Sequence, residues 1–229
     1  MRRIMVAAAL VTLSSPLAAQ ATQQAKENDP TRKVAGGIGV AGWHGRLDDN
    51  AVKRGMSIND AKFVAAGTNS YHVTSGPAAI YYAPKFDVKG AYTARASFTQ
   101  VKAPTYPEAY GLFIGGHDLD GPSQSYLYFL TRGDGKILIN HRAGAEVHKL
   151  VDWTDSEATK KQDESGKVTN ELAIRVTSDS VQFLANGIPV KAFAKAEMHG
   201  FNTDGQAGVR VNHNLEVHVA NFEVKAAKK

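Results

Sequence analysis

The chain has 229 residues, a formal net charge of +5 and no cysteine. Without cysteine there are neither disulfides nor thiolate metal sites, so the fold must be held by core burial, for which the chain is long enough. The basic residues are spread along the chain apart from a lysine-rich stretch at residues 225–229. Because a nucleic-acid-binding protein carries a clustered basic stripe, we predict no nucleic-acid partner.

Residues 1–21 have the pattern of a secretory signal peptide. A Met-Arg-Arg start precedes an apolar run over residues 4–13, and Ala19 and Ala21 supply the small side chains that signal peptidase recognises. This run is much shorter than the roughly twenty residues of a membrane-spanning helix. We therefore predict cleavage of the signal peptide, a periplasmic or secreted protein without a membrane span, and a flexible polar leader over residues 22–33.

Residues 34–229 are predicted to form one all-β domain. Polar and apolar residues alternate most clearly over residues 91–99, which is typical of an antiparallel strand with one buried face. Similar strand-like runs cover residues 78–83, 109–114, 125–132, 136–142, 171–177, 180–185, 188–193, 207–213 and 215–224. Asn186 and Gly187 separate two of them, and Asn-Gly is a strong hairpin signal. Only a weak helical pattern occurs, near residues 154–164. The many strand-like runs and the near absence of helical pattern together predict a β-sandwich.

The hairpin that follows residues 125–132 is predicted to have a three-residue turn. A two-residue turn would pair Phe129 with Asn140 and so mix apolar and polar side chains on one face. A three-residue turn with Gly135 in the left-handed region pairs Phe129 with Ile139 and separates the two kinds of side chain. Since a one-residue shift exchanges whole faces of a sheet, we expect the second register.

In that register one face of the hairpin carries polar and aromatic side chains that suit a sugar. Tyr126 and Tyr128 lie beside Asn140 and Arg142, and Arg210 joins them if its strand shares the sheet. Aromatic rings can stack on sugar rings, while arginine and asparagine can hydrogen-bond hydroxyls. We predict these five residues as ligand-binding. The alternative stays open that tyrosines simply favour half-exposed strands.

A polar loop beside this face contains the candidate catalytic residues. His117 and Asp118 lie in it, and together with Glu108 they are the candidates for acid and base. The same loop could bind a hard cation such as Ca²⁺, although its Asp-x-Asp-Gly sequence is also ordinary turn chemistry. The histidines show no tight metal-ligand spacing, so we assign no metal ligand and no required cofactor, and leave Ca²⁺ open.

Several motifs follow one another in the order of a known family. They are YGLF at 110–113, YLYF at 126–129, GDGK at 133–136, Trp153, NEL at 170–172, FLANG at 183–187, GQAGVRV at 205–211 and Phe222. The order resembles the concanavalin A-like (laminin-G-like) jelly rolls, particularly the bacterial exported 3-keto-disaccharide hydrolase family, over about residues 75–225. The resemblance implies a single antiparallel jelly-roll sandwich and a carbohydrate-binding or carbohydrate-active role. In the wider superfamily calcium is sometimes bound. The E-x-D-x-x-E signature of the related laminarinase-type glucanases is absent from the sequence.

Three functions remain as alternatives at this point. The first is an exported carbohydrate-binding protein whose ligand lies on the polar concave face of a sheet. The second is a hydrolase of glycosides or 3-keto-glycosides with carboxylate and histidine acid–base chemistry, for which two carboxyl groups should lie about 5–10 Å apart. The third is a structural or protein-interaction domain of the cell envelope. The partner of the first two is a carbohydrate or glycoside, and the sequence does not assign an oligomeric state.

Overall fold

The structure is a computed structural model that describes residues 29, 31–198 and 201–227. The predicted signal peptide and most of the predicted leader therefore lie outside the described residues. No helix in the described part of the chain is both long and apolar enough to cross a membrane.

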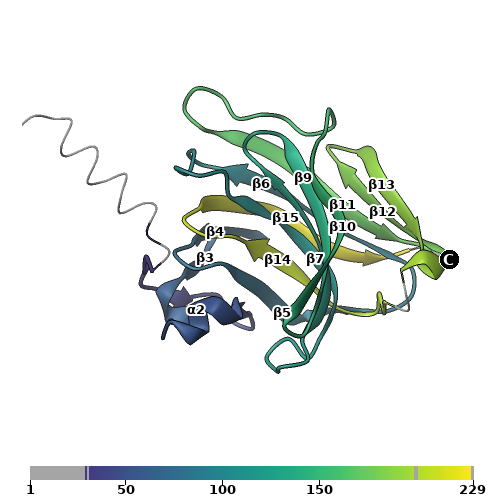
Figure 1. Cartoon of the computed structure of the whole chain (residues 1–229), viewed down its shortest axis with the longest axis horizontal. Coiled ribbons are helices and arrows are strands. Elements are labelled where there is room, and N and C mark those ends of the chain that lie inside the picture. Colours follow the sequence, from purple (N-terminus) through teal and green to yellow (C-terminus); the bar gives the residue numbers. More distant parts are fainter. Residues whose placement is uncertain (1–28, 30, 199–200, 228–229) are drawn as a thin grey trace, which may run out of the picture.

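Within the described residues, two sheets form the molecule (Figure 1). The eight-stranded sheet has the order β1 (Gly37–Ile38), β3 (Lys62–Gly67), β4 (Ser70–Thr74), β15 (Glu216–Ala226), β6 (Tyr92–Gln100), β11 (Val168–Val176), β12 (Ser180–Ala185), β13 (Ile188–Ala194). The seven-stranded sheet has the order β10 (Glu146–Asp155), β9 (Lys136–Ala143), β8 (Ser125–Arg132), β7 (Ala109–His117), β14 (Gly205–Val211), β5 (Ala79–Val88), β2 (His44–Leu47). The short helices are α2 (Asp49–Lys53), η1 (Ile58–Asp60) and η2 (Lys195–Glu197).

The predicted all-β, antiparallel jelly-roll sandwich is confirmed. Apart from the two-residue β1, which pairs with β3 in parallel, the recorded strand pairs are antiparallel. Side chains from both sheets meet in one apolar core. Phe129 of β8 and Phe183 of β12, for example, contact edge to face with ring centroids 5.5 Å apart. Burial of these inward-facing residues holds the two sheets together.

The predicted register of the β8–β9 hairpin is confirmed. Phe129 pairs with Ile139, and Gly135 takes a positive φ of 84° in the turn. The turn between β12 and β13 also forms where it was predicted, with positive φ angles of 51° at Asn186 and 81° at Gly187. Both turns follow from local chemistry, because asparagine and glycine tolerate the left-handed region.

The weak helical pattern near residues 154–164 corresponds to no helix in the described part of the structure. Residues 154 and 155 instead end β10, an edge strand with two register shifts and mostly exposed side chains. An edge strand that carries charges such as Lys149 and Asp152 lacks the regular alternation of a half-buried strand. The period of two that revealed strands such as β6 is therefore missing here, and β2, β3 and β4 also lay outside the predicted strand-like runs.

Candidate functional site

The structure brings four of the predicted ligand-binding residues into one cluster on the outer face of the seven-stranded sheet. Arg210 Nη1 donates a hydrogen bond to the Tyr126 hydroxyl at 3.2 Å, and Asn140 Nδ2 donates to the Tyr128 hydroxyl at 3.1 Å. The Arg210 guanidinium also lies 5.1 Å from the centre of the Tyr128 ring, in cation–π contact. We call Tyr126, Tyr128, Asn140 and Arg210 the floor cluster.

The floor cluster is closed to solvent. The exposed fractions are 1% for Tyr126, 6% for Tyr128, 5% for Asn140 and 7% for Arg210. Leu119, from the loop between β7 and β8, belongs to the same packed group as both tyrosines. The two tyrosine rings therefore present no open stacking platform, and a ligand would have to lie beside or above the cluster.

Asp48 links the floor cluster to the surface. Its carboxylate accepts hydrogen bonds from Arg210 Nη1 at 2.8 Å and Nη2 at 2.6 Å, which is the bidentate geometry typical of arginine–carboxylate pairs. Arg142 Nη2 lies 3.9 Å from the same carboxylate. Burial raises the pKa of Asp48. The charge and hydrogen bonds of Arg210 outweigh burial, with smaller contributions from Arg142 and His213, so the pKa of Asp48 lies below its ordinary value. Asp48 is therefore ionised.

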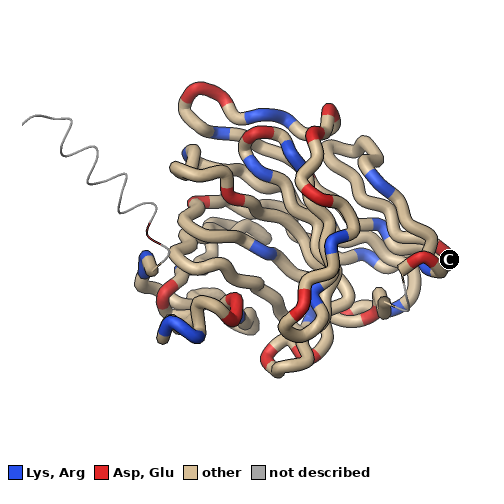
Figure 2. Tube along the Cα trace, viewed as in Figure 1, with Lys and Arg blue, Asp and Glu red and all other residues tan. Residues whose placement is uncertain are grey.

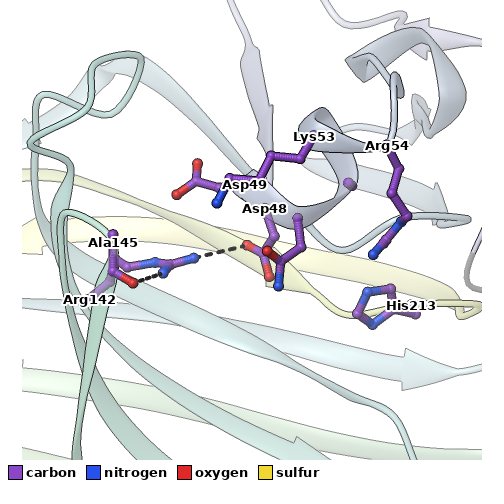
Figure 3. Close-up of a pocket in the computed structure, with 9 residues that line it drawn as sticks. Asp48, Asp49, Lys53, Arg54, Arg142, Ala145 and His213 are labelled. Carbon is purple, nitrogen blue, oxygen red and sulfur yellow. Dashed lines mark hydrogen bonds and ion pairs between the residues drawn. The ribbon is translucent and has the colours of Figure 1, made fainter.

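A pocket of about 330 Å³ opens beside Asp48 (Figure 3). It is lined by Asp48, Asp49, Asn50, Ala51, Lys53, Arg54, Arg142, Ala145 and His213. These residues come from α2 and its two flanks, from the end of β9 with the turn that follows it, and from the turn between β14 and β15. We call this the α2 pocket.

Charges of both signs lie together at the α2 pocket. Figure 2 shows acidic and basic positions next to each other on the α2 segment. Asp49 Oδ1 forms an ion pair with Arg46 Nη2 at 2.9 Å. Arg142 reaches the pocket from β9, where its Nη1 donates to the Ala145 carbonyl at 3.2 Å (Figure 3). Arginine, lysine and carboxylate groups around one cavity can hydrogen-bond a polar ligand from several sides.

The predicted catalytic residues do not lie together. Glu108 is beside the α2 pocket, where its Oε1 is 3.8 Å from His213 Nδ1. His117 is the last residue of β7, and Glu108 immediately precedes the first residue of that strand. At about 3.3 Å per strand residue the two are roughly 25–30 Å apart. Glu108 and His117 therefore cannot act on the same bond.

Asp118 is engaged in closing the loop between β7 and β8. Its Oδ2 accepts a hydrogen bond from the Ser123 backbone N–H at 2.9 Å, and its φ is +46°. In the same loop Asp120 accepts a hydrogen bond from the Tyr82 hydroxyl at 2.5 Å. Both carboxylates thus serve as turn and anchor groups, which is the ordinary chemistry of Asp-x-Asp-Gly.

The described residues contain no group of three or more His, Asp or Glu side chains placed to hold a metal ion. The polar loop with His117 and Asp118 therefore offers no cation site of that kind within this part of the chain.

Sequence reasoning missed most of the residues that line the α2 pocket. Asp48, Asp49, Lys53 and Arg54 belong to a five-residue helix and its flanks, which is too short to show a helical period. The Asp-Asp-Asn sequence at 48–50 is a helix-start signal that could have indicated it. Asp48 takes the cap position without a side-chain cap bond, because its carboxylate is bonded to Arg210 instead.

No protein-family model matches the sequence, and no curated protein matches it either. Solved structures do. A carbohydrate-binding module of Bacillus subtilis, CBM66, has a TM-score of 0.56 at 10% identity, over 81% of this chain and 96% of that chain. A Bacillus subtilis protein of unknown function with a galectin-like fold has a TM-score of 0.55 at 12% identity, over 82% of this chain and 90% of that chain.

An alginate lyase, A1-II′, has a TM-score of 0.51 at 12% identity, over 81% of this chain and 94% of that chain. At such low identities these matches show the fold alone. The class that fold and topology define is a jelly-roll β-sandwich of two mainly antiparallel sheets.

Proposed function

We propose that this protein binds a carbohydrate in the α2 pocket. The observation that carries the proposal is a cavity of about 330 Å³ lined by charged and amide side chains. Ligand pockets have volumes of about 300–1,000 Å³, so this cavity suits a small saccharide. Two of the similar structures, a carbohydrate-binding module and an alginate lyase, are named for carbohydrates, which supports the same ligand class on this fold. The family resemblance adds 3-keto-glycosides to the ligands worth testing.

The carboxylates of the pocket favour binding over hydrolysis. Glycoside hydrolysis needs one carboxyl group that stays protonated to act as the acid. Asp48 is ionised because Arg210 lowers its pKa, and Asp49 is ion-paired with Arg46. Neither side chain is placed as a proton donor.

The test is a thermal-shift screen of the mature protein against neutral oligosaccharides, uronic-acid oligosaccharides and 3-keto-glycosides. A ligand that binds the folded state raises the melting temperature, and a concentration of 100 times Kd adds about 2.7 kcal/mol. We expect at least one sugar to give a concentration-dependent shift that Arg142→Ala removes.

The control is Arg175→Ala, which removes an exposed arginine of β11 in the other sheet and should leave the shift intact. If no sugar shifts the melting temperature, the proposal fails. A protein-interaction domain of the cell envelope would then be the function to test.

A second candidate, a hydrolase or lyase that acts on the same ligand, rests on Glu108 and His213. A carboxylate 3.8 Å from a histidine at the edge of a pocket can orient the imidazole for proton transfer. Product analysis of each bound sugar tests it. We expect His213→Gln to abolish product release while binding persists. A wild-type protein that binds sugars and releases no product excludes this candidate for those sugars.

A further inference from the structure

We infer that the α2 pocket selects a saccharide that carries an anionic group, such as the carboxylate of a uronic acid. The inference rests on the proposed function and narrows its ligand class. It is carried by the balance of charge around the pocket, taken residue by residue.

The two carboxylates of the pocket are already matched by arginines. Arg210 contacts both oxygens of Asp48, at 2.8 and 2.6 Å, and Arg210 is itself buried. Arg46 contacts Asp49 at 2.9 Å and donates a further bond to the Leu119 carbonyl at 2.9 Å. Each carboxylate is thus neutralised by an arginine that does not itself line the pocket.

The remaining charges that line the pocket are positive. Lys53 and Arg142 contribute two cations in addition to the arginines that match Asp48 and Asp49, and His213 is a further basic group that pairs with Glu108. The nearest carboxylate to Arg142 is Asp48, whose oxygen is 3.9 Å away and shared with Arg210. Arg142 is also mostly covered, with a side-chain exposure of 12%. The pocket therefore carries more positive charge than its own carboxylates balance.

A ligand with one negative charge would match this excess better than a neutral sugar. Covering the wall cations with a neutral ligand removes water from charged groups and offers no counter-charge. A carboxylate or sulfate would instead form charge-assisted hydrogen bonds with arginine and lysine. The sugar ring supplies the hydroxyls for Asp48, Asp49 and Asn50.

Isothermal titration calorimetry of the mature wild-type protein tests the inference directly. The probes are an oligogalacturonide, its fully methyl-esterified form, a sulfated oligosaccharide of similar length and inorganic phosphate. We expect the acid to bind at least tenfold more tightly than the ester, with the advantage shrinking in 0.5 M NaCl because exposed charges are screened. Comparison of the acid with the sulfated sugar identifies which anionic group is preferred.

Charge-removing variants locate the effect. Lys53→Gln, at the end of α2, should reduce the acid-to-ester ratio several-fold. The matched control is Lys89→Gln, which removes the same charge at an exposed position between β5 and β6. Lys89 follows the C-terminal end of β5, whereas Ala78, whose carbonyl accepts a hydrogen bond from the Asp48 backbone, precedes the N-terminal end of that strand. Lys89→Gln should leave the ratio unchanged.

The outcomes separate the inference from the proposed function. Equal binding of acid and ester overturns the anionic preference and leaves a carbohydrate-binding protein. Binding of phosphate as tight as that of the charged sugars overturns the saccharide part and indicates a simple anion site. If none of the sugars binds, in this titration or in the wider screen, the proposed function fails and the inference fails with it.

Discussion

Asp48 is the residue on which the site depends, because it connects the buried floor cluster to the α2 pocket. Its carboxylate binds Arg210 of the floor cluster and lies near Arg142 at the pocket wall. The stability of a largely buried ion pair depends on both partners, because removal of either one leaves an uncompensated charge.

Arg210→Met should destabilise the protein by about 3 kcal/mol. Breaking a buried pair typically costs 3–5 kcal/mol, and the lower end applies because the Asp48 side chain keeps 23% exposure. The measurement is the free energy of unfolding in urea. Asp48→Asn combined with Arg210→Met should cost less than the sum of the single variants, because the two residues interact.

The matched control for that prediction is Arg95→Met, which breaks the pair with Glu223 on the other sheet, where Arg95 is 47% exposed. An exposed pair contributes at most about 1 kcal/mol. Equal losses for Arg210→Met and Arg95→Met would show that the Asp48–Arg210 pair has no special role.

Asp48 should also contribute to acid sensitivity. Because its pKa is lower in the folded protein than in the unfolded chain, the unfolded chain binds the proton first. The stabilisation is therefore complete above about pH 4 and is lost as the pH falls through the folded-state pKa. Unfolding free energies measured from pH 6 to pH 2 should fall less steeply for Asp48→Asn than for the wild type. Parallel curves would contradict the assignment.

Among the elements, the β8–β9 hairpin positions four of the predicted ligand-binding residues. Its register pairs Tyr126 with Arg142 and Tyr128 with Asn140, which puts all four side chains on one face. A two-residue turn would move Asn140 and Arg142 to the opposite face. The turn glycine thus determines which residues reach the site.

Gly135→Ala should cost about 1–2 kcal/mol in unfolding free energy, because an L-residue with a side chain is disfavoured at a φ of +84°. Gly135→Asn is the matched variant. Asparagine tolerates the left-handed region better, so it should cost less than alanine. If alanine and asparagine cost the same, crowding against Lys161, whose Cγ would lie 2.9 Å from the new Cβ, would be the cause instead.

At the scale of the whole molecule, the sandwich separates residues that the sequence suggested as partners and joins others. Glu108 and His117 lie at opposite ends of β7, whereas Asp48, Arg142 and His213 meet around one pocket. The meeting depends on β14 pairing between β7 and β5, which brings the turn after β14 beside the segment before α2.

We also propose that the protein is exported and cleaved after Ala21. Expression of the full chain in a bacterial host followed by intact-mass analysis of the periplasmic fraction tests this. The expected mass lacks residues 1–21. A protein of full length in the cytoplasm would contradict it. Ala19→Asp and Ala21→Asp should block cleavage, because signal peptidase requires small residues there.

The sequence by itself determined the features that depend on neighbouring residues. Alternation of polar and apolar side chains predicted most strands, Asn186-Gly187 predicted a turn, and the separation of faces predicted the Phe129–Ile139 register. These follow from local periodicity and turn chemistry. The edge strand β10 and the five-residue α2 escaped because neither is long and regular enough to show a period.

Only the tertiary structure decided which polar residues are open to a ligand. Tyr126 and Tyr128 face outward from their strand, yet they are buried because Leu119 and Arg210 cover or contact them. Asp48 gained its partner 162 positions along the chain. Contacts at such separations come from sheet order and loop packing, which no local pattern encodes. The pocket beside Asp48 therefore became visible only once the two sheets were assembled.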